Sequence, residues 1–145
     1  MGRMTIAAGA ATADQLSPVD AWLGTGVSFP LLPDPQYGGL AWVSGMDLVR
    51  QSIETILDTE PGERIMVPSF GCGLRQFLMA PNTAATRTAM RTEITEALTT
   101  WEPRIRLTDV SVTTGEIPTL VWVDISYVRL MDLRPDNLVY PFYLQ

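Results

Sequence analysis

The chain has 145 residues, of which 46% are hydrophobic and 18% are charged, so it can fold around a core of its own. Its formal net charge of −6 argues against nucleic acid as the main partner, because phosphate binding needs a basic surface. No apolar run approaches the roughly 18 residues that a membrane span requires, so we expect no membrane segment.

Two residue counts limit the chemistry that the chain can perform. Histidine is absent, which removes serine–histidine and cysteine–histidine catalysis and every histidine-containing metal site. Cys72 is the single cysteine, so no internal disulfide can form and a reducing compartment is expected. Because Cys72 lies between Gly71 and Gly73, a small side chain packed in a turn is a simpler interpretation than a reactive thiol. We expect no catalytic residue, cofactor or metal ion.

The N-terminal part of the chain contains little that predicts a helix. Residues 1–20 are rich in Ala, Thr and Gly and are predicted to form a flexible arm, with a single domain over residues 21–145. Three prolines between Ala21 and Gly45 forbid a helix and favour extended backbone. Aromatic side chains are expected to hold this segment against the domain or a neighbour: Trp22, Phe29, Tyr37 and Trp42.

Two helices are predicted from apolar periodicity. Ser44 is expected to cap the first, whose apolar residues recur at helical spacing from Met46 to Leu57 before Pro61-Gly62 ends it. A short strand, Ile65 to Val67, and one or two amphipathic turns follow. The second helix is predicted from Pro81 to about Thr100, and its buried face comprises Met90, Ile94, Ala97, Leu98 and Trp101.

After Trp101 the apolar period changes to two, which indicates strands. They are expected at Ile105 to Thr113, with a bulge near Asp109, and at Thr119 to Leu130, with Val121, Val123, Ile125 and Tyr127 on one face. A turn at Pro135 to Asn137 precedes a last apolar strand, Leu138 to Leu144. The predicted fold is α+β, with helices packed on a small, mostly antiparallel β-sheet and an extended N-terminal arm.

Several short motifs occur in a distinctive order: a helix ending in Ile56-Leu57-Asp58-Thr59, then Pro61-Gly62-Glu63-Arg64, Pro68-Ser69-Phe70-Gly71 and Glu102-Pro103-Arg104. This order resembles the small baseplate wedge, or sheath-initiator, family of contractile phage tails and phage-tail-like injection systems. The resemblance covers roughly residues 22–144. It implies a structural protein in six copies that links the baseplate wedge to the first sheath ring, assembled in the cytoplasm. The implied partners are larger wedge proteins and the sheath subunit, with tail tube or hub proteins as further candidates.

The same resemblance implies roles for residues in two of these motifs. Glu63 and Arg64 would be a structural pair buried in a compact connector with Phe70 and Gly71, and the alternative is a surface pair of little energetic value. Glu102, Pro103 and Arg104 would dock the larger wedge proteins, because a rigid proline presents two outward-facing charged side chains in a fixed relation. The alternative is an ordinary helix terminus followed by proline.

The last strand is predicted to act between chains. In the family that the sequence resembles, the C-terminal strand joins strands of a sheath subunit and templates sheath assembly by β-augmentation. Proline is tolerated in sheets almost only at edges or bulges, and the chain provides no later element to cover this edge. The alternative is a strand packed inside its own domain. The predicted partner-binding residues are Leu138, Val139, Tyr140, Pro141, Phe142 and Tyr143.

Two other functions stay open at this point. A muramidase-like cell-wall hydrolase would need two acids about 5–10 Å apart across a sugar cleft. The acidic residues from Glu54 to Glu63 are close in sequence, but with 16 acidic residues in the chain such a cluster marks no cleft. A generic assembly adaptor is the other alternative. A phage tail, a tailocin, a secretion system and an extracellular injection system all fit the preferred interpretation.

Overall fold

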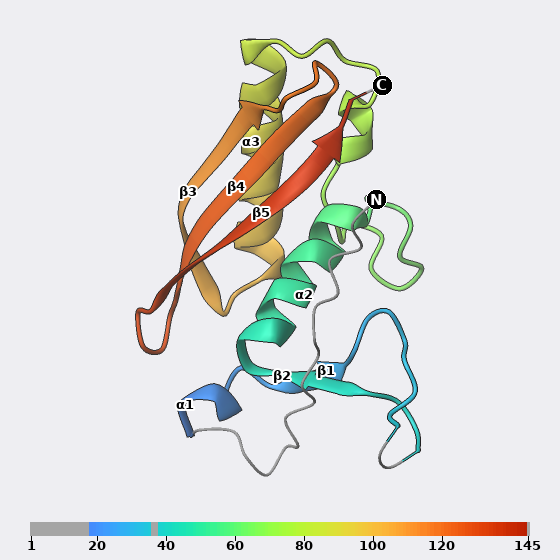
Figure 1. The fold of residues 1–145 in the computed structure, drawn as a ribbon, viewed down its shortest axis with the longest axis vertical. Helices are drawn as coiled ribbons and strands as arrows, with labels where there is room; N and C mark the ends of the chain where they lie inside the picture. Colours follow the sequence, from blue (N-terminus) through green and yellow to red (C-terminus); the bar gives the residue numbers. More distant parts are fainter. Residues whose placement is uncertain (1–17, 36–37, 145) are drawn as a thin grey trace. The chain divides into compact units, whose positions relative to one another are not determined.

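The computed structural model describes residues 18–35 and 38–144 (Figure 1). The chain divides into two compact units, Met1–Val49 and Arg50–Gln145. The predicted flexible arm lies almost wholly outside the described residues, as does Tyr37. What the structure describes of it belongs to α1 (Pro18–Ala21), a single helical turn. None of the helices within the described ranges is both long enough and apolar enough to span a membrane.

The first unit contains a small antiparallel sheet. β1 (Thr25–Val27) pairs with β2 (Trp42–Ser44), and an isolated bridge joins Pro33 to Leu40 between them. The non-helical backbone predicted from the prolines is therefore confirmed over the described part of this segment. Phe29 and Trp42, two of the expected aromatic anchors, are 72% and 55% exposed.

The first long helix begins where the sequence predicts. Helix α2 covers Gly45–Asp58, directly after the expected capping residue, Ser44. From Arg50 onward the helix belongs to the second unit. Its buried residue Ile53 lies about one helical turn before Ile56 and Leu57, which are also buried, as the predicted apolar face requires.

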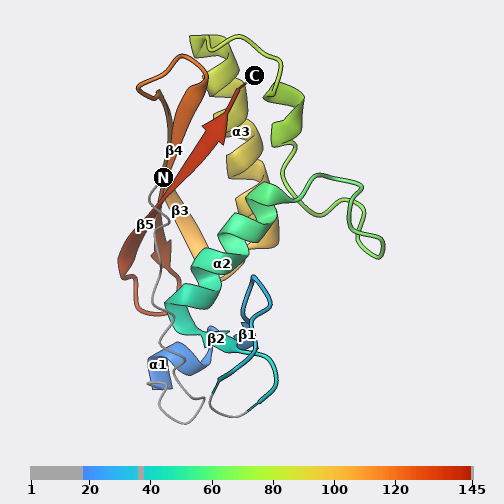
Figure 2. The ribbon, with the colours of Figure 1, turned by 45° about the vertical axis from the view of Figure 1, so that its right-hand side comes forward.

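The second unit is built on a three-stranded antiparallel sheet in the order β3-β4-β5. The strands are β3 (Ile105–Thr114), β4 (Leu120–Arg129) and β5 (Pro135–Tyr143). Helix α3 (Ala84–Trp101) lies across one face of this sheet, and the short 3-10 helix η2 (Leu74–Phe77) precedes it (Figure 1, Figure 2). The predicted α+β class is confirmed.

The core of this unit agrees with the apolar pattern of the sequence. The predicted inward residues of β4 are all buried, and so are the central residues of α3: Val121, Val123, Ile125, Tyr127, Met90, Ile94, Ala97 and Leu98. The expected bulge in β3 lies between Leu107 and Asp109. Thr83 caps α3 by accepting a hydrogen bond from the Thr86 amide at 3.2 Å, so the helix begins later than Pro81.

Two predicted elements are wrong. Ile65 to Val67 forms no strand, because this segment is an exposed loop with no neighbouring strand to pair with among the described residues. Pro135 to Asn137 is not a turn but the start of β5, paired with β4. The turn lies earlier, around Leu133, whose φ of 53° places it in the left-handed region.

Candidate functional site

β5 forms one margin of the sheet, because β4 is its sole partner among the described strands. The predicted site residues of this strand all lie in the paired region, from Leu138 opposite Ile125 to Tyr143 opposite Leu120. β5 is therefore an edge strand of the sheet, as predicted. The use of this edge by another chain stays a prediction.

The backbone N–H and C=O groups of successive β5 residues point alternately toward β4 and toward the open margin, as antiparallel pairing requires. The Leu144 amide donates to the Thr119 carbonyl at 2.7 Å, and the Arg129 amide donates to the Arg134 carbonyl at 3.1 Å. Both bonds give the same phase, in which even-numbered residues of β5 bond to β4 and odd-numbered residues point outward. Pro141 is odd-numbered, so its missing N–H costs the sheet no hydrogen bond.

The open margin consequently has few free donors. The Asn137 amide is already used, because it donates to the Asp136 carboxylate at 2.9 Å. Pro141 has no amide N–H at all. The amides that remain for a strand from another chain are those of Val139 and Tyr143.

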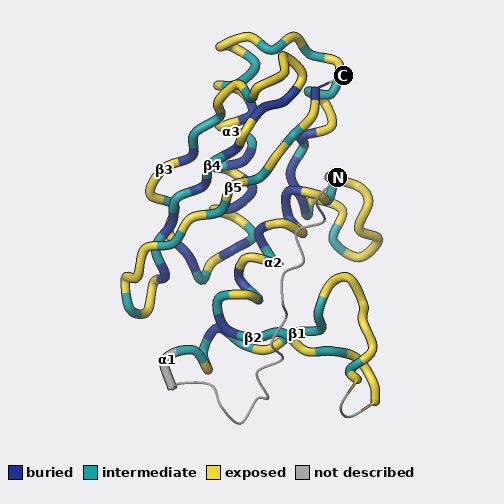
Figure 3. The backbone as a smooth tube through the Cα atoms, in the orientation of Figure 1, coloured by how far each residue is buried: buried dark blue, intermediate teal, exposed yellow. Residues whose placement is uncertain are grey.

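Side chains of β5 also alternate, as the burial pattern along the strand shows (Figure 3). The even-numbered residues are half-buried and share a face with the buried residues of β4. On the other face, Val139 and Tyr143 are 49% and 56% exposed, beside Trp122 of β4 at 37%. These three residues form an outer apolar patch next to the open margin.

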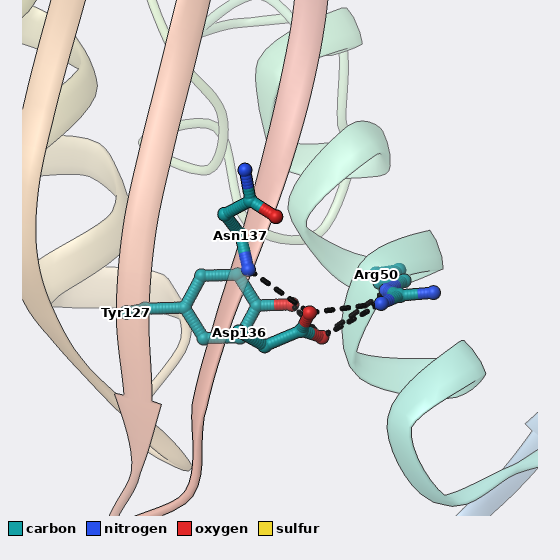
Figure 4. Close-up of polar contacts among 4 residues, drawn as sticks. All are labelled: Arg50, Tyr127, Asp136 and Asn137. Carbon is teal, nitrogen blue, oxygen red and sulfur yellow. Dashed lines mark hydrogen bonds and ion pairs between the residues drawn. The ribbon is translucent and has the colours of Figure 1, made fainter.

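An anchor of four residues holds β5 on its inner face (Figure 4). Arg50 of α2 donates to both carboxylate oxygens of Asp136, at 2.8 Å and 3.0 Å from Nη2, and the Tyr127 hydroxyl donates to the same carboxylate at 3.1 Å. Burial opposes the charge on Asp136, but the hydrogen bonds from Arg50, the Asn137 amide and Tyr127 outweigh it and lower the pKa of the carboxyl. Asp136 is thus an ionised anchor. No sequence pattern indicates this group, because Arg50 and Asp136 are 86 residues apart.

A second bond joins the same two elements. The Tyr140 hydroxyl donates to the Asp58 carboxylate at the end of α2. Burial, followed by this carboxylate, raises the pKa of the Tyr140 hydroxyl, which stays protonated and keeps its role as donor. The two predicted alternatives for β5 therefore do not exclude each other, since the strand is bonded into its own unit and still has an open margin.

The Glu102-Pro103-Arg104 junction lies directly after α3. Glu102 is only 1% exposed, so the expectation that its side chain faces outward is wrong. Arg104 binds it with two bonds of 2.6 Å, from Nε to Oε1 and from Nη2 to Oε2. Helical spacing could have predicted the burial of Glu102. This residue follows Ile94 and Leu98 at intervals of four residues and shares their buried face. Pro103 is exposed.

The connector after α2 also departs from expectation at its charged pair. Glu63 and Arg64 are both exposed and do not pair with each other, so the predicted buried pair is wrong. The Glu63 carboxylate instead accepts from Arg75 at 2.7 Å, and the Arg64 guanidinium lies 4.6 Å from the centre of the Phe70 ring. Neighbouring residues in a turn point apart, which is why adjacency in sequence did not give the pairing.

Gly71 is required by the backbone. Its φ is +117°, a value that side chains strongly disfavour. A Cβ at this position would lie 2.2 Å from the Thr59 carbonyl oxygen. Cys72 is buried beside it, and burial, followed by the charge of Glu93, raises the pKa of its thiol to about 12. The thiol is therefore packed in the turn, as the sequence indicated.

A metal site would need clustered ligands, and a sugar cleft would need acids that line a hollow. No group of three or more Cys, Asp and Glu side chains converges as metal ligands within residues 18–35 and 38–144. One open hollow of about 280 Å³ contains the Arg91–Asp109 ion pair, whose bond is 3.0 Å long. Another, of about 480 Å³, contains Asp136, which is held ionised.

Residues 43–133 match the family described as baseplate wedge protein gp25. A search among curated proteins gave no match.

Solved structures gave further similarities. A Geobacter sulfurreducens protein provisionally described as a tail lysozyme has 38% identity and a TM-score of 0.65, over 69% of this chain and 91% of that one. A chain of the six-fold symmetrised anti-feeding prophage baseplate has 26% identity and a TM-score of 0.64, over 88% and 90%. A chain of the postcontracted pyocin R2 baseplate has 30% identity and a TM-score of 0.47, over 78% and 97%.

Proposed function

We propose that this chain, which belongs to the baseplate wedge protein gp25 family, links the baseplate wedge to the first sheath ring and templates sheath assembly through β5. Family membership makes it a structural baseplate component of a contractile tail or tail-like injection system and argues against an unrelated adaptor. The six-fold symmetry of the related anti-feeding prophage baseplate supports six copies. The chain would assemble in the cytoplasm and then belong to the particle.

The open margin of β5 is the observation that carries the sheath-templating part of the proposal. A bare strand edge with apolar side chains is a template for pairing with another chain. β5 offers outward amides at Val139 and Tyr143, next to the outer apolar patch. An incoming sheath strand would gain main-chain hydrogen bonds from the margin and side-chain contacts from the patch. The inner-face anchor at Asp136 would hold the template rigid meanwhile.

Val139→Pro tests this role without disturbing the domain. The substitution removes an outward amide but no bond to β4, because Val139 is an outward-facing residue of the ladder. We expect the variant to melt close to the native temperature and to enter baseplates, while sheath no longer polymerises on them. Val139→Ala is the matched control, because it trims the same side chain and keeps the amide. Normal sheath growth on Val139→Pro baseplates would contradict templating by β5.

The proposed contact with the larger wedge proteins, and with tube or hub proteins if these also reach it, lies at Pro103 and the exposed part of Arg104. Glu102 supports it from inside by fixing the guanidinium through two bonds. Pro103→Glu changes an exposed side chain and leaves this ion pair in place. The variant should fold normally and fail to enter baseplates, which co-purification with wedge proteins would measure. Full incorporation would show that docking occurs elsewhere.

We propose no hydrolase activity, although one related protein carries the provisional description of tail lysozyme. Desolvation by neighbouring atoms, followed by the charge of Asp58, raises the pKa of Glu54, an exposed residue, in the direction that a general acid requires. Glu54 nevertheless lines neither of the two open hollows. Purified protein should leave peptidoglycan intact from acid to neutral pH. Clearing that disappears in Glu54→Gln would refute the proposal.

A further inference from the structure

The loop of residues 59–72, between α2 and η2, presents two apolar side chains to water. Ile65 is 93% exposed and Met66 is 87% exposed, the highest values among the large apolar residues that the structure describes. Burying such a side chain is favourable, because its apolar surface leaves water. A segment that exposes two large apolar side chains to solvent is therefore a candidate site for binding another protein.

The base of this loop is tightly closed. The Cys72 amide donates to the Thr59 carbonyl at 2.8 Å, so the two ends of the loop touch. Gly71 allows this approach, because any Cβ there would collide with the same carbonyl. Farther along, the Gly62 amide donates to the Pro68 carbonyl at 2.6 Å and closes the loop a second time, below the tip.

Charged side chains brace the loop against η2. Glu60 accepts a hydrogen bond of 2.7 Å from the Arg75 amide, and Glu63 accepts one of 2.7 Å from the Arg75 guanidinium. The Glu60 amide in turn donates to Glu63 Oε2 at 3.0 Å. These exposed bonds are individually weak, but together they fix the direction of the segment that leads to Ile65.

Aromatic rings support the other side. The Arg64 guanidinium lies 4.6 Å from the Phe70 ring centre, and Phe70 packs at 5.3 Å, tilted, on Trp101 at the end of α3. The tip is thus held from both sides before any partner arrives. A preorganised loop loses little conformational entropy on binding, so more of the contact energy becomes affinity.

We propose that the tip Arg64-Ile65-Met66 inserts into an apolar socket, bordered by a carboxylate, on a different protein of the same particle. Arg64 supplies the charge argument, because within the described residues its contact is with an aromatic ring and no carboxylate pairs with it. A second copy of this chain is a poor occupant. The carboxylates in its two open hollows are already paired, Asp109 with Arg91 and Asp136 with Arg50, so these hollows offer Arg64 no free acid. The inference rests on the proposed baseplate function.

Two methionines of similar exposure give a test within one chain. Met66 and Met79 are 87% and 82% exposed, so hydrogen peroxide should oxidise them at similar rates in the isolated protein. In assembled particles we expect Met66 to react at least tenfold more slowly than in the isolated protein. A photo-cross-linking residue at position 66 should then join this chain to a different protein, at a segment that contains apolar side chains and an acid.

Other outcomes overturn the inference. Met66 that oxidises equally fast in particles shows a tip that stays in water. Absence of a cross-link, or a cross-link to a second copy of this chain, excludes the proposed socket. If the native chain is missing from particles altogether, the proposed function itself fails, which is a separate result.

Substitutions give an independent readout. Ile65→Ser with Met66→Ser should leave the melting temperature unchanged, because both side chains are exposed, and should lower incorporation into baseplates at least tenfold. Met79→Ser is the matched control and should incorporate normally. Incorporation of the double variant at the native level would likewise overturn the inference.

Discussion

Replacing Arg104 by Met should expose how much the fold depends on the buried ion pair at the α3–β3 junction. Methionine keeps a long apolar stem and removes the guanidinium. The Glu102 carboxylate, 1% exposed, would then lose both of its 2.6 Å bonds from Arg104 and remain in the interior. A buried charge without its partner is far more costly than a missing surface pair.

The size of the effect follows from the geometry. Unit charges about 4 Å apart attract by about 4 kcal/mol at an effective dielectric constant of about 20, and losing one partner of a buried pair typically costs about 3–5 kcal/mol. The Arg104 side chain is 23% exposed, so water can reach the vacated position and the lower value applies. We expect a loss of about 3 kcal/mol, or about 10 °C in melting temperature for a chain of this length.

Urea denaturation followed by circular dichroism would measure this loss, with two controls. Arg106→Met makes the same change at an exposed position of β3 and should cost less than about 0.5 kcal/mol. Combining Arg104→Met with Glu102→Gln removes both charges and should recover about 2 kcal/mol. Equal, small losses at Arg104 and Arg106 would refute the reasoning and restore the outward-facing pair that the sequence suggested.

Three further predictions concern the second unit. The folded state lowers the pKa of Asp136, so its ionisation stabilises the fold fully above the ordinary carboxyl pKa near 4. This stability is lost as the pH falls from about 4 toward the lower pKa of the folded state. Acid titration of Arg50→Met should show a smaller loss of stability over the same pH range. Cys72, with a thiol pKa of about 12, should resist iodoacetamide at pH 8 in folded protein and react after denaturation in urea. Gly71→Ala should destabilise the chain by at least about 2 kcal/mol in thermal denaturation, since φ is +117° and the Thr59 carbonyl blocks the Cβ; an unchanged melting temperature would contradict this.

Apolar periodicity predicted the elements correctly where a helix or strand buries only one of its faces. Along β4, Val121 to Tyr127 alternate with residues of the other face, and a strand has no other way to bury every second residue. Proline was a less reliable indicator of a turn at Pro135. The sequence predicts a turn there, because the local residue chemistry favours one. In the sheet its nitrogen points to the open margin, where no amide is needed, and a strand results.

Pairings between charged residues could not be predicted, because they depend on which elements meet in space. Glu63 is adjacent to Arg64 in sequence and binds Arg75 instead. Arg50 and Asp136 are 86 residues apart, and no local pattern links them. The motif order did identify the family, since it records constraints on the whole fold rather than on one contact.

The three surfaces proposed for partners share one construction. Each presents exposed groups, namely the Val139 margin, Pro103 and the Ile65-Met66 tip, that contribute little to the fold. Each is fixed from behind by polar contacts, through Asp136, Glu102 or Glu63. Substitutions should therefore fall into two classes. Changes in the supporting contacts lower stability and assembly together, most strongly at buried Glu102, whereas changes in the exposed groups impair assembly at unchanged stability. A baseplate component benefits from this separation, because its binding surfaces can follow a changing partner without loss of the fold.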